Sequence, residues 1–297
     1  MNLPDNQTLR LHFPQWQGGN NPPYHLGAQL LAWLAPQSSG PMEEVFVPVP
    51  DGTALEKENG IVARGALIQQ QREARRLIDK HRPDRLVVLG GDCLVDLAPF
   101  AYLNERYGGD LAVLWVDSHP DISTPEQLPT AHAMVLASLM GQADPEFAAE
   151  VAVPVKPANV LYVGVHDPNA WEAKEMERLG LRNVSPEMLA EQGSAPVLDW
   201  LRSTGARHVA VHFDLDVLET SGFRAQLMAN PSGLSPFLQG VAQGELSMTQ
   251  VISVLRDVAE VADVVGLGIA EHLPWDAINL KRMLEQLPLI GTPPQRG

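Results

Sequence analysis

The sequence predicts an α/β protein with a three-layer αβα architecture and a mostly parallel sheet. Short apolar runs rich in Val, Leu and Ile alternate along the chain with longer amphipathic segments. Several of these runs are almost continuously apolar, which is typical of strands that are buried on both faces of a sheet. No repeat or linker divides the 297 residues, so we expect a single domain over residues 1–297.

The strands are predicted from runs of β-branched and other apolar residues that turn signals interrupt. Residues 111–116, for example, read LAVLWV without a single polar side chain. In chain order, we expect strands at residues 9–13, 45–49, 85–89, 111–116, 160–165, 208–213 and 264–269.

The helices are predicted from apolar residues that recur every three or four positions. Residues 61–80 show this spacing among many Gln and Arg residues and end before Pro83. Ser185 followed by Pro186 is typical of a helix cap with proline at the first helical position. We expect helices over residues 61–80, 167–179, 248–261 and 274–287, and one that begins at Pro186.

Composition limits the classes of partner. The chain has 36 acidic and 21 basic residues and a formal net charge of −15, which argues against a nucleic-acid or anionic-membrane surface and permits cationic ligands. The single cysteine excludes an internal disulfide. Because we find neither a leader pattern nor an apolar run of membrane-spanning length, we expect a soluble cytoplasmic protein.

The strongest chemical signal is the segment LAVLWVDSHPD, residues 111–121. Side chains two residues apart share one face of a strand, so Asp117 and His119 should project together where this strand ends, with Asp121 close behind. Open α/β sheets place their ligands at the carboxyl ends of strands. These side chains are therefore candidate metal ligands.

A second strand ends in a similar way, because HVAVHFDLDVLE places Asp214 and Asp216 after an apolar run. One Asp-x-Asp pair at a strand end is often only a helix cap or loop anchor. Carboxylates from two strand ends, however, would be unfavourable when buried together unless cations compensated their charge. The two motifs together predict a divalent-metal site.

Four motifs in the order GGDC, WVDSHPD, HFDLD and GIAEHLP resemble the ureohydrolase family of arginases, agmatinases and formiminoglutamases. The resemblance covers most of the chain, including VGVHDPNAWEAKEMERLGL. It implies a parallel-sheet αβα fold and a two-metal centre, usually of manganese. It also implies hydrolysis of a guanidino or related amidine C–N bond, which releases urea or a substituted urea.

The resemblance also implies roles for individual residues. Asp117 and Asp214 would bridge the metals, His119 and Asp216 would complete one metal site, and Asp121 with the residue at position 93 would complete the other. A metal-bridging hydroxide would attack the guanidinium carbon, and Asp121 would hold it and pass its proton to the leaving amine. Glu271 would pair with the substrate guanidinium. His132 would relay protons, although a histidine at a helix start is often structural.

Cys93 stands where arginases and agmatinases have a histidine that binds the more exposed metal. A thiolate is softer than imidazole and favours zinc, nickel or cobalt over manganese. Alternatively, Cys93 is a small buried hydrophobe beside a weakened site. The sequence leaves both interpretations open.

Further departures concern the substrate. The segment EQLPTA, residues 126–131, replaces the loop that reads the carboxylate of arginine in arginases, and Glu219-Thr220 replaces the usual Asp-Pro. We therefore expect a small cationic guanidino substrate other than free arginine. His166 and Asp167 are candidate substrate-binding residues, although Asp167 before Pro168 is equally consistent with a helix cap.

Two other functions are compatible with these residues. The chain could be a non-catalytic or weakly active subunit in a hetero-oligomer with a competent paralogue, because members of the family assemble as trimers or hexamers; otherwise we expect a homo-oligomer. It could also be a one-metal amidohydrolase of the deacetylase type. Asp121 and Glu271 favour the guanidino hydrolases over this last alternative.

Overall fold

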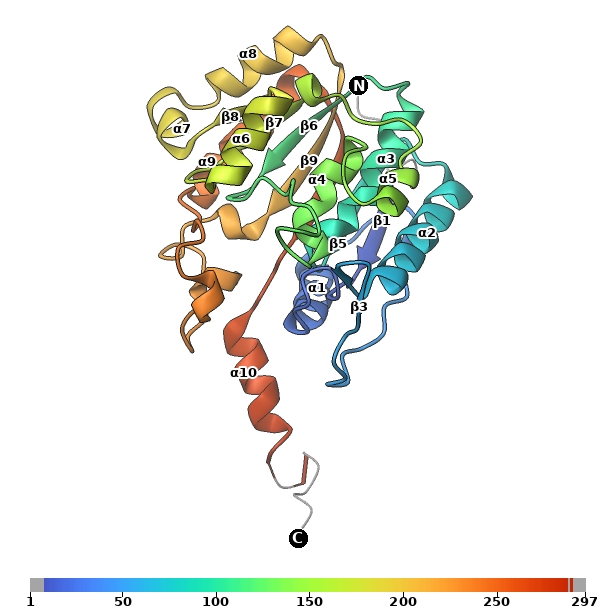
Figure 1. Cartoon of the computed structure of the whole chain (residues 1–297), viewed down its shortest axis with the longest axis vertical. Helices are drawn as coiled ribbons and strands as arrows, with labels where there is room; N and C mark the ends of the chain where they lie inside the picture. Colours follow the sequence, from blue (N-terminus) through green and yellow to red (C-terminus); the bar gives the residue numbers. More distant parts are fainter. Residues whose placement is uncertain (1–7, 288, 291–297) are drawn as a thin grey trace.

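A parallel sheet forms the centre of the protein. The computed structural model describes residues 8–287 and 289–290. These residues fold around an eight-stranded sheet in the order β2-β1-β5-β10-β9-β6-β7-β8 (Figure 1). All of its neighbouring strands pair in parallel, which confirms the predicted fold class. The strands are β1 Thr8–Phe13, β2 Met42–Glu44, β5 Arg85–Gly90, β6 Leu111–Val116, β7 Val160–Val163, β8 Arg182–Val184, β9 His208–Asp214 and β10 Asp263–Ala270.

The strand predictions are confirmed to within two residues at each end for all but one segment. Residues 45–49 are not a strand, because the second strand ends at Glu44 and the chain then leaves the sheet. The proline at position 48 lacks an amide donor, and its carbonyl accepts a hydrogen bond from the Trp16 indole instead (2.9 Å). The short edge strand β8 was not predicted, since three residues give too little pattern.

The helices flank the sheet. The predicted helix at 248–261 is α9 as expected, and Ser185 caps α7 by accepting from the Met188 amide. The prediction for 61–80 began too early, because Ile61–Val62 pair with Lys57–Glu58 in a small β-hairpin, β3 and β4. The helices are α1 Pro23–Leu34, α2 Arg64–His81, α3 Leu97–Arg106, α4 Val135–Leu139, α5 Pro145–Ala149, α6 Ala170–Leu179, α7 Pro186–Gln192, α8 Ala195–Thr204, α9 Met248–Val261 and α10 Trp275–Leu284.

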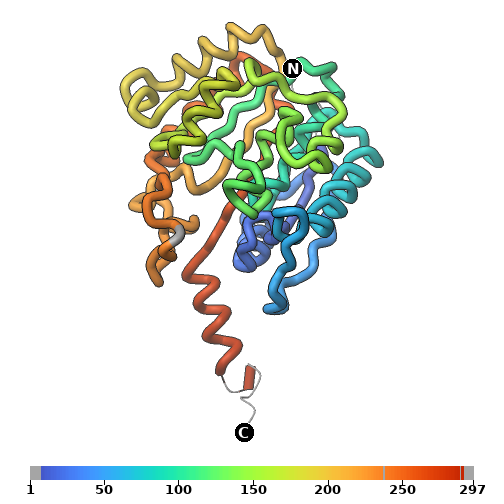
Figure 2. The backbone as a smooth tube through the Cα atoms, in the orientation of Figure 1, coloured from blue at the N-terminus to red at the C-terminus, as the bar shows by residue number. Residues whose placement is uncertain are grey.

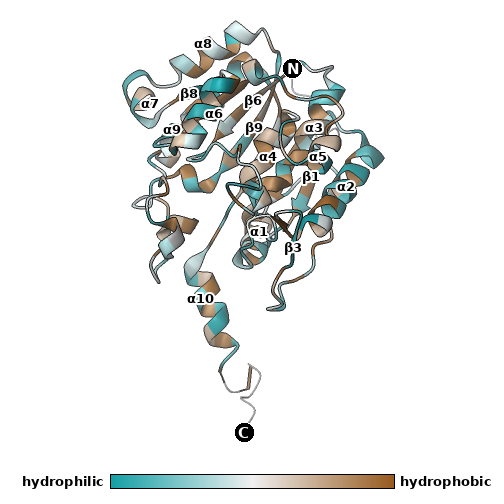
Figure 3. Ribbon diagram, viewed as in Figure 1, coloured by the Kyte–Doolittle hydropathy of each residue, from teal (hydrophilic) through white to brown (hydrophobic). Residues whose placement is uncertain are grey.

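Two apolar clusters sandwich the sheet, and strand β6 contributes alternate residues to them. Val113 and Trp115 face the cluster under α2 and α3, whereas Leu114 and Val116 face the cluster under α8 and α9. Apolar colour accordingly follows the central strands while the outer helices are largely polar outside (Figure 3). Helix α10 extends away from the body (Figure 2). Among the described residues, no helix combines the length and apolar character that a membrane crossing needs.

The sheet order explains where the chemical residues meet. Strands β5, β10, β9 and β6 are consecutive neighbours, and each ends at a segment with acidic, histidine or cysteine side chains. Parallel strands bring their carboxyl ends to one edge of the sheet. Segments far apart in sequence therefore meet above the centre of the sheet. The single domain over residues 1–297 stays a prediction.

Gly91, which follows β5, contacts the ends of β1 and β10. Its amide donates to the Phe13 carbonyl, and its carbonyl accepts from the Glu271 amide (2.7 Å). A β-carbon at this position would lie 1.7 Å from the Gln15 carbonyl oxygen, so a side chain would force the two backbone segments apart.

We expect Gly91→Ala to lower the free energy of unfolding by about 1–3 kcal/mol through overpacking. Urea unfolding followed by circular dichroism would measure the change. Gly222→Ala is the control, because there the nearest atom is the flexible end of the Glu219 side chain at 3.2 Å. Equal stability of the two variants would contradict this account of Gly91.

Candidate metal centre

The Gly90-Gly91-Asp92 motif positions Cys93 at one side of the site. Asp92 caps the 3₁₀ turn Cys93–Asp96 by accepting from the Leu94 amide, and it also accepts from the Gly19 amide (3.1 Å). Burial raises the pKa of Asp92 to about 7. A β-carbon at Gly18 would lie 2.4 Å from the Asp92 carboxylate, so only glycine lets this loop approach so closely. The loop fixes the start of the turn that presents Cys93.

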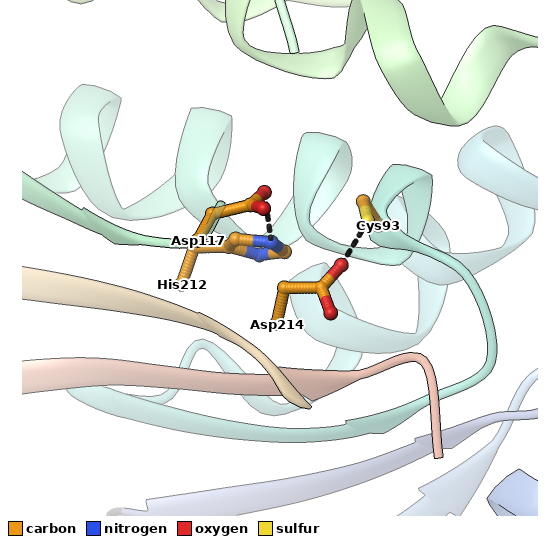
Figure 4. Close-up of side chains that lie close together, drawn as sticks. All are labelled: Cys93, Asp117, His212 and Asp214. Atoms are coloured by element: carbon orange, nitrogen blue, oxygen red, sulfur yellow. Dashed lines mark hydrogen bonds and ion pairs between the residues drawn. The ribbon is translucent and has the colours of Figure 1, made fainter. Parts of the chain in front are cut away.

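The predicted ligands gather into groups that suit metal ions. Cys93, Asp117, His212 and Asp214 each place one donor atom within 4.8 Å of the others (Figure 4). Asp117 also belongs to a second such group with His119 and Asp216. A third group consists of Asp214, Asp216 and Glu271. The structure thus brings Cys93, His119 and the predicted aspartates other than Asp121 together in overlapping groups, two of which share Asp117.

Backbone amides orient these carboxylates. The Asp117 side chain accepts from the His119 amide (2.7 Å) and from the Trp115 indole (3.0 Å). The Asp214 side chain accepts from the Asp216 amide (2.7 Å). The His119 ring places Nδ1 3.1 Å from Asp216 and directs Nε2 to the Ala242 carbonyl. These contacts orient Asp117, Asp214 and His119, as the neighbours of metal ligands do.

Cys93 is buried and lies beside acidic side chains. Its thiol donates to Asp214 Oδ2 (3.0 Å) and lies 3.4 Å from Glu271 Oε1. Burial, followed by the charges of Glu271 and Asp214, raises the pKa of this thiol. In the metal-free protein Cys93 is therefore a protonated hydrogen-bond donor, and it must release a proton to become a metal ligand.

The donor set fits divalent cations. Burial and the neighbouring Asp216 raise the pKa of Asp117 to about 7 and that of Glu271 to about 8. Burial also raises the pKa of Asp121 and Asp214. Asp121 Oδ2 and Asp216 Oδ1 are buried without a hydrogen-bond partner. Buried carboxylates that repel one another and retain free oxygens are the environment that bound cations would stabilise.

Glu271 lies at the end of β10, and its position is strained. Its backbone has φ +63°, in the left-handed region that disfavours residues other than glycine. The Tyr24 hydroxyl, from α1, donates to Glu271 Oε2, while Oε1 faces Cys93. The hydrogen bond from the Glu271 amide to Gly91 secures this conformation. Strained residues held in this way are typical of functional sites.

Asp121 and His132 line the cavity beside the donor groups without belonging to them. Asp121 is also strained, with φ +48°. His132 directs Nδ1 to the Gly18 carbonyl (3.1 Å), which leaves Nε2 as its other ring nitrogen. Burial lowers the pKa of His132 to about 4, so its imidazole is neutral near neutral pH.

His166 and Asp167 lie across the same cavity, which has a volume of about 340 Å³. Asp167 does not cap the following helix, because Asn169 takes that role in a capping box with Glu172. The Asp167 backbone has φ +44°. His166 Nδ1 lies 3.0 Å from the Gly164 carbonyl oxygen. Of the described residues that line the cavity, none is Lys or Arg, whereas several are Asp or Glu.

Three buried residues of the site were missed by the sequence reasoning: Tyr24, Asp96 and His212. His212 precedes Asp214 by two residues on one strand, so strand alternation alone could have found it. Tyr24 follows two prolines in a loop-rich region, and no local pattern links it to Glu271.

Fold and site together define an α/β protein with a metal-binding donor set at the carboxyl edge of a parallel sheet. The chain belongs to the Arginase family, whose model matches residues 47–279. It is 26% identical over 218 residues to an arginase of Coccidioides immitis, a match that covers 69% of this chain and 64% of that protein. The chain thus spans less than two thirds of the length of this relative.

Solved structures show the same fold. An arginase of Entamoeba histolytica, in complex with L-ornithine, superposes with a TM-score of 0.75 at 18% identity and covers 90% of this chain and 91% of that one. A formimidoylglutamase of Bacillus subtilis superposes with a TM-score of 0.61 at 15% identity, covering 90% and 78% respectively.

The raised acid pKa values predict how the metal-free protein responds to pH. Asp117 and Glu271 titrate near 7 and 8 in the folded chain and near 4 when unfolded, so the folded state holds more protons between these values. Stability of the metal-free protein should therefore fall as pH rises from about 5 to about 8. Scanning calorimetry would measure the melting temperature, and added divalent metal should raise it more at the higher pH.

The double variant Asp117→Asn/Glu271→Gln is the control, because it removes two of the titrating groups and should make this part of the profile shallower, while Asp92, with a pKa of about 7, still titrates. A metal-free wild type that becomes more stable over this pH range would contradict the electrostatic account.

Proposed function

We propose that this chain is a metal-dependent hydrolase of a guanidino or related amidine C–N bond, which releases urea or a substituted urea. The observation that carries the proposal is the pair of buried donor groups that share Asp117 beside an acidic cavity. Membership of the Arginase family supports this class of reaction. The two donor groups that share Asp117 favour a two-metal centre over a one-metal deacetylase-like site.

The proposed cofactors are two divalent metal ions. Manganese is the metal that the family resemblance implies, whereas Cys93 favours zinc, cobalt or nickel because its sulfur is a softer ligand. When bound, such ions would acidify a water molecule and stabilise charge that develops on the guanidinium group. Cys93, Asp117, His119, Asp121, Asp214 and Asp216 are the proposed ligands from sequence, and the described geometry supports all of them except Asp121 through a shared group.

The remaining residues would position substrate and protons. Glu271 would orient the guanidinium through charge-assisted hydrogen bonds, and the Tyr24 hydroxyl would hold one carboxylate oxygen in place. Asp121, with a buried unpartnered oxygen, would take the proton of the attacking water and deliver it to the leaving amine. His132 would offer Nε2 as a relay, since its Nδ1 faces Gly18.

We propose a cationic guanidino substrate without a carboxylate group. The acidic lining of the cavity includes Asp167 and Glu172 in addition to members of the donor groups, and a substrate carboxylate would be repelled there. His166 and Asp167 would contact the distal part of the substrate. The cavity therefore suits a second positive charge at that end and disfavours free arginine.

A non-catalytic or weakly active subunit is the second candidate. It is favoured by the Cys93 thiol, which in the metal-free protein is hydrogen-bonded to Asp214 and not available as an anionic ligand. This candidate would place the chain in a hetero-oligomer with a competent paralogue. A trimeric or hexameric assembly and a cytoplasmic location stay part of the proposal.

Purified protein loaded separately with manganese, nickel, cobalt or zinc should release urea from carboxylate-free guanidino compounds such as agmatine. The expected kcat/KM for these compounds exceeds that for arginine by at least about tenfold, because the acidic cavity repels the carboxylate. Colorimetric urea detection across a guanidino panel measures this. Absence of turnover with every metal would overturn catalysis by this chain alone and would leave the subunit hypothesis, which co-purification with a paralogue would test.

Cys93→His should raise manganese occupancy, because imidazole is a harder ligand than thiolate. Elemental analysis after dialysis against equal manganese and zinc would report the ratio. Cys93→Ser is the control, since it removes the sulfur without adding an imidazole. Manganese occupancy that is the same in all three proteins would show that position 93 does not contact a metal.

A further inference from the structure

His212 is a buried histidine to which neither the motifs nor the family resemblance gives a role. It lies in β9, opposite Trp115 of β6 in the register, and its ring stacks on the Trp115 ring with centroids 3.7 Å apart. The side chain is fully buried. Because it precedes Asp214 by two residues in a strand, both side chains point to the same face of the sheet, toward Cys93 and Asp117 (Figure 4).

One ring nitrogen of His212 has a dedicated carboxylate partner. Nδ1 lies 2.7 Å from Asp96 Oδ2, and Asp96 is itself fully buried at the end of the turn that begins with Cys93. The fold makes room for this carboxylate at Gly268, where a β-carbon would lie 1.9 Å from an Asp96 oxygen. A histidine whose one nitrogen faces a carboxylate is the arrangement found behind metal-bound imidazoles.

The other ring nitrogen faces the donor group. Nε2 is buried and has no hydrogen-bond partner among the residues that the structure describes, although it lies 3.8 Å from Asp117 Oδ2. Because Nδ1 is paired with Asp96, Nε2 is the nitrogen of His212 that is left to bind an ion together with Cys93, Asp117 and Asp214. An unpartnered buried nitrogen that is aimed at a thiol and two carboxylates requires an explanation.

We propose that His212 Nε2 is a metal ligand. Held by Asp96, His212 supplies an imidazole from β9, in place of the histidine that Cys93 replaces in the first motif. This inference rests on the proposed metal centre but not on the proposed substrate. The resulting set of one sulfur, one nitrogen and two carboxylate oxygens suits a four-coordinate zinc or cobalt ion. Asp96 is a positioning residue, because it acts on the ion only through His212.

Cobalt titration of the metal-free protein tests the proposal without any activity assay. Visible absorption should report two cobalt sites in the wild type, one of them with a thiolate charge-transfer band. His212→Gln should weaken the site with this band by at least about tenfold and leave the second site unchanged. Asp96→Asn should weaken the same site by about 10- to 100-fold.

His208→Gln is the matched control. His208 lies on the same strand and stacks on Tyr107 with centroids 3.8 Å apart, but it lies at the opposite end of β9 from the donor groups. Its substitution should leave both cobalt affinities at wild-type values. Equal affinities in His212→Gln and His208→Gln would overturn the proposal and assign His212 to a buried pair with Asp96.

Substitution of His212 leaves Asp96 buried without its partner and could prevent folding, so the wild type supplies a second measurement. Anomalous diffraction from cobalt-soaked crystals should place an ion about 2.0–2.1 Å from His212 Nε2. An ion on the Cys93 side more than about 3 Å from Nε2 would overturn the inference. Cobalt bound by His212 without guanidine turnover would instead contradict only the proposed substrate chemistry.

Discussion

Repulsion among buried carboxylates is the constraint on which the rest of the site depends. Three neighbouring strands, β10, β9 and β6, end at one edge of the sheet and deliver Asp117, Asp214, Asp216 and Glu271 into the same small volume. Without cations, Asp117 and Glu271 hold protons at pH values where carboxylates are normally ionised, because burial and the neighbouring Asp216 raise their pKa values to about 7 and about 8. Bound divalent ions would convert an unfavourable cluster into a functional one. The arrangement of these carboxylates is therefore consistent with a fold that binds divalent metal ions.

The scaffold holds the cluster through backbone contacts that tolerate little change. Gly91 lets the ends of two strand segments touch, and the same residue accepts the Glu271 amide. Asp121 and Glu271 keep left-handed backbone conformations that cost free energy. Tyr24, from a helix far away in sequence, then fixes the Glu271 carboxylate. Stability and site geometry thus depend on the same contacts.

Local sequence patterns predicted the central strands and most of the residues that form the donor groups, because both depend on residues close together in the chain. The buried strand before Asp117 and the Asp-x-His-x-Asp spacing needed no tertiary information. Residues 45–49 were mistaken for a strand, because β-branched residues next to prolines give the same local pattern as an edge strand. Tyr24 could not be predicted, since its role depends on how α1 packs against β1 and β5 and so reaches Glu271 after β10. Strand alternation could have identified His212, but a histidine inside an apolar strand resembles an ordinary core residue.

Metal stoichiometry tests the central claim most directly. Equilibrium dialysis of the metal-free protein against zinc or cobalt, followed by elemental analysis, should give two ions per chain. Asp117→Asn should lose high-affinity binding of both ions, because the group with Cys93 and the group with His119 both contain this carboxylate. Binding of no ion by the wild type, or full retention of two ions by Asp117→Asn, would contradict the shared metal centre.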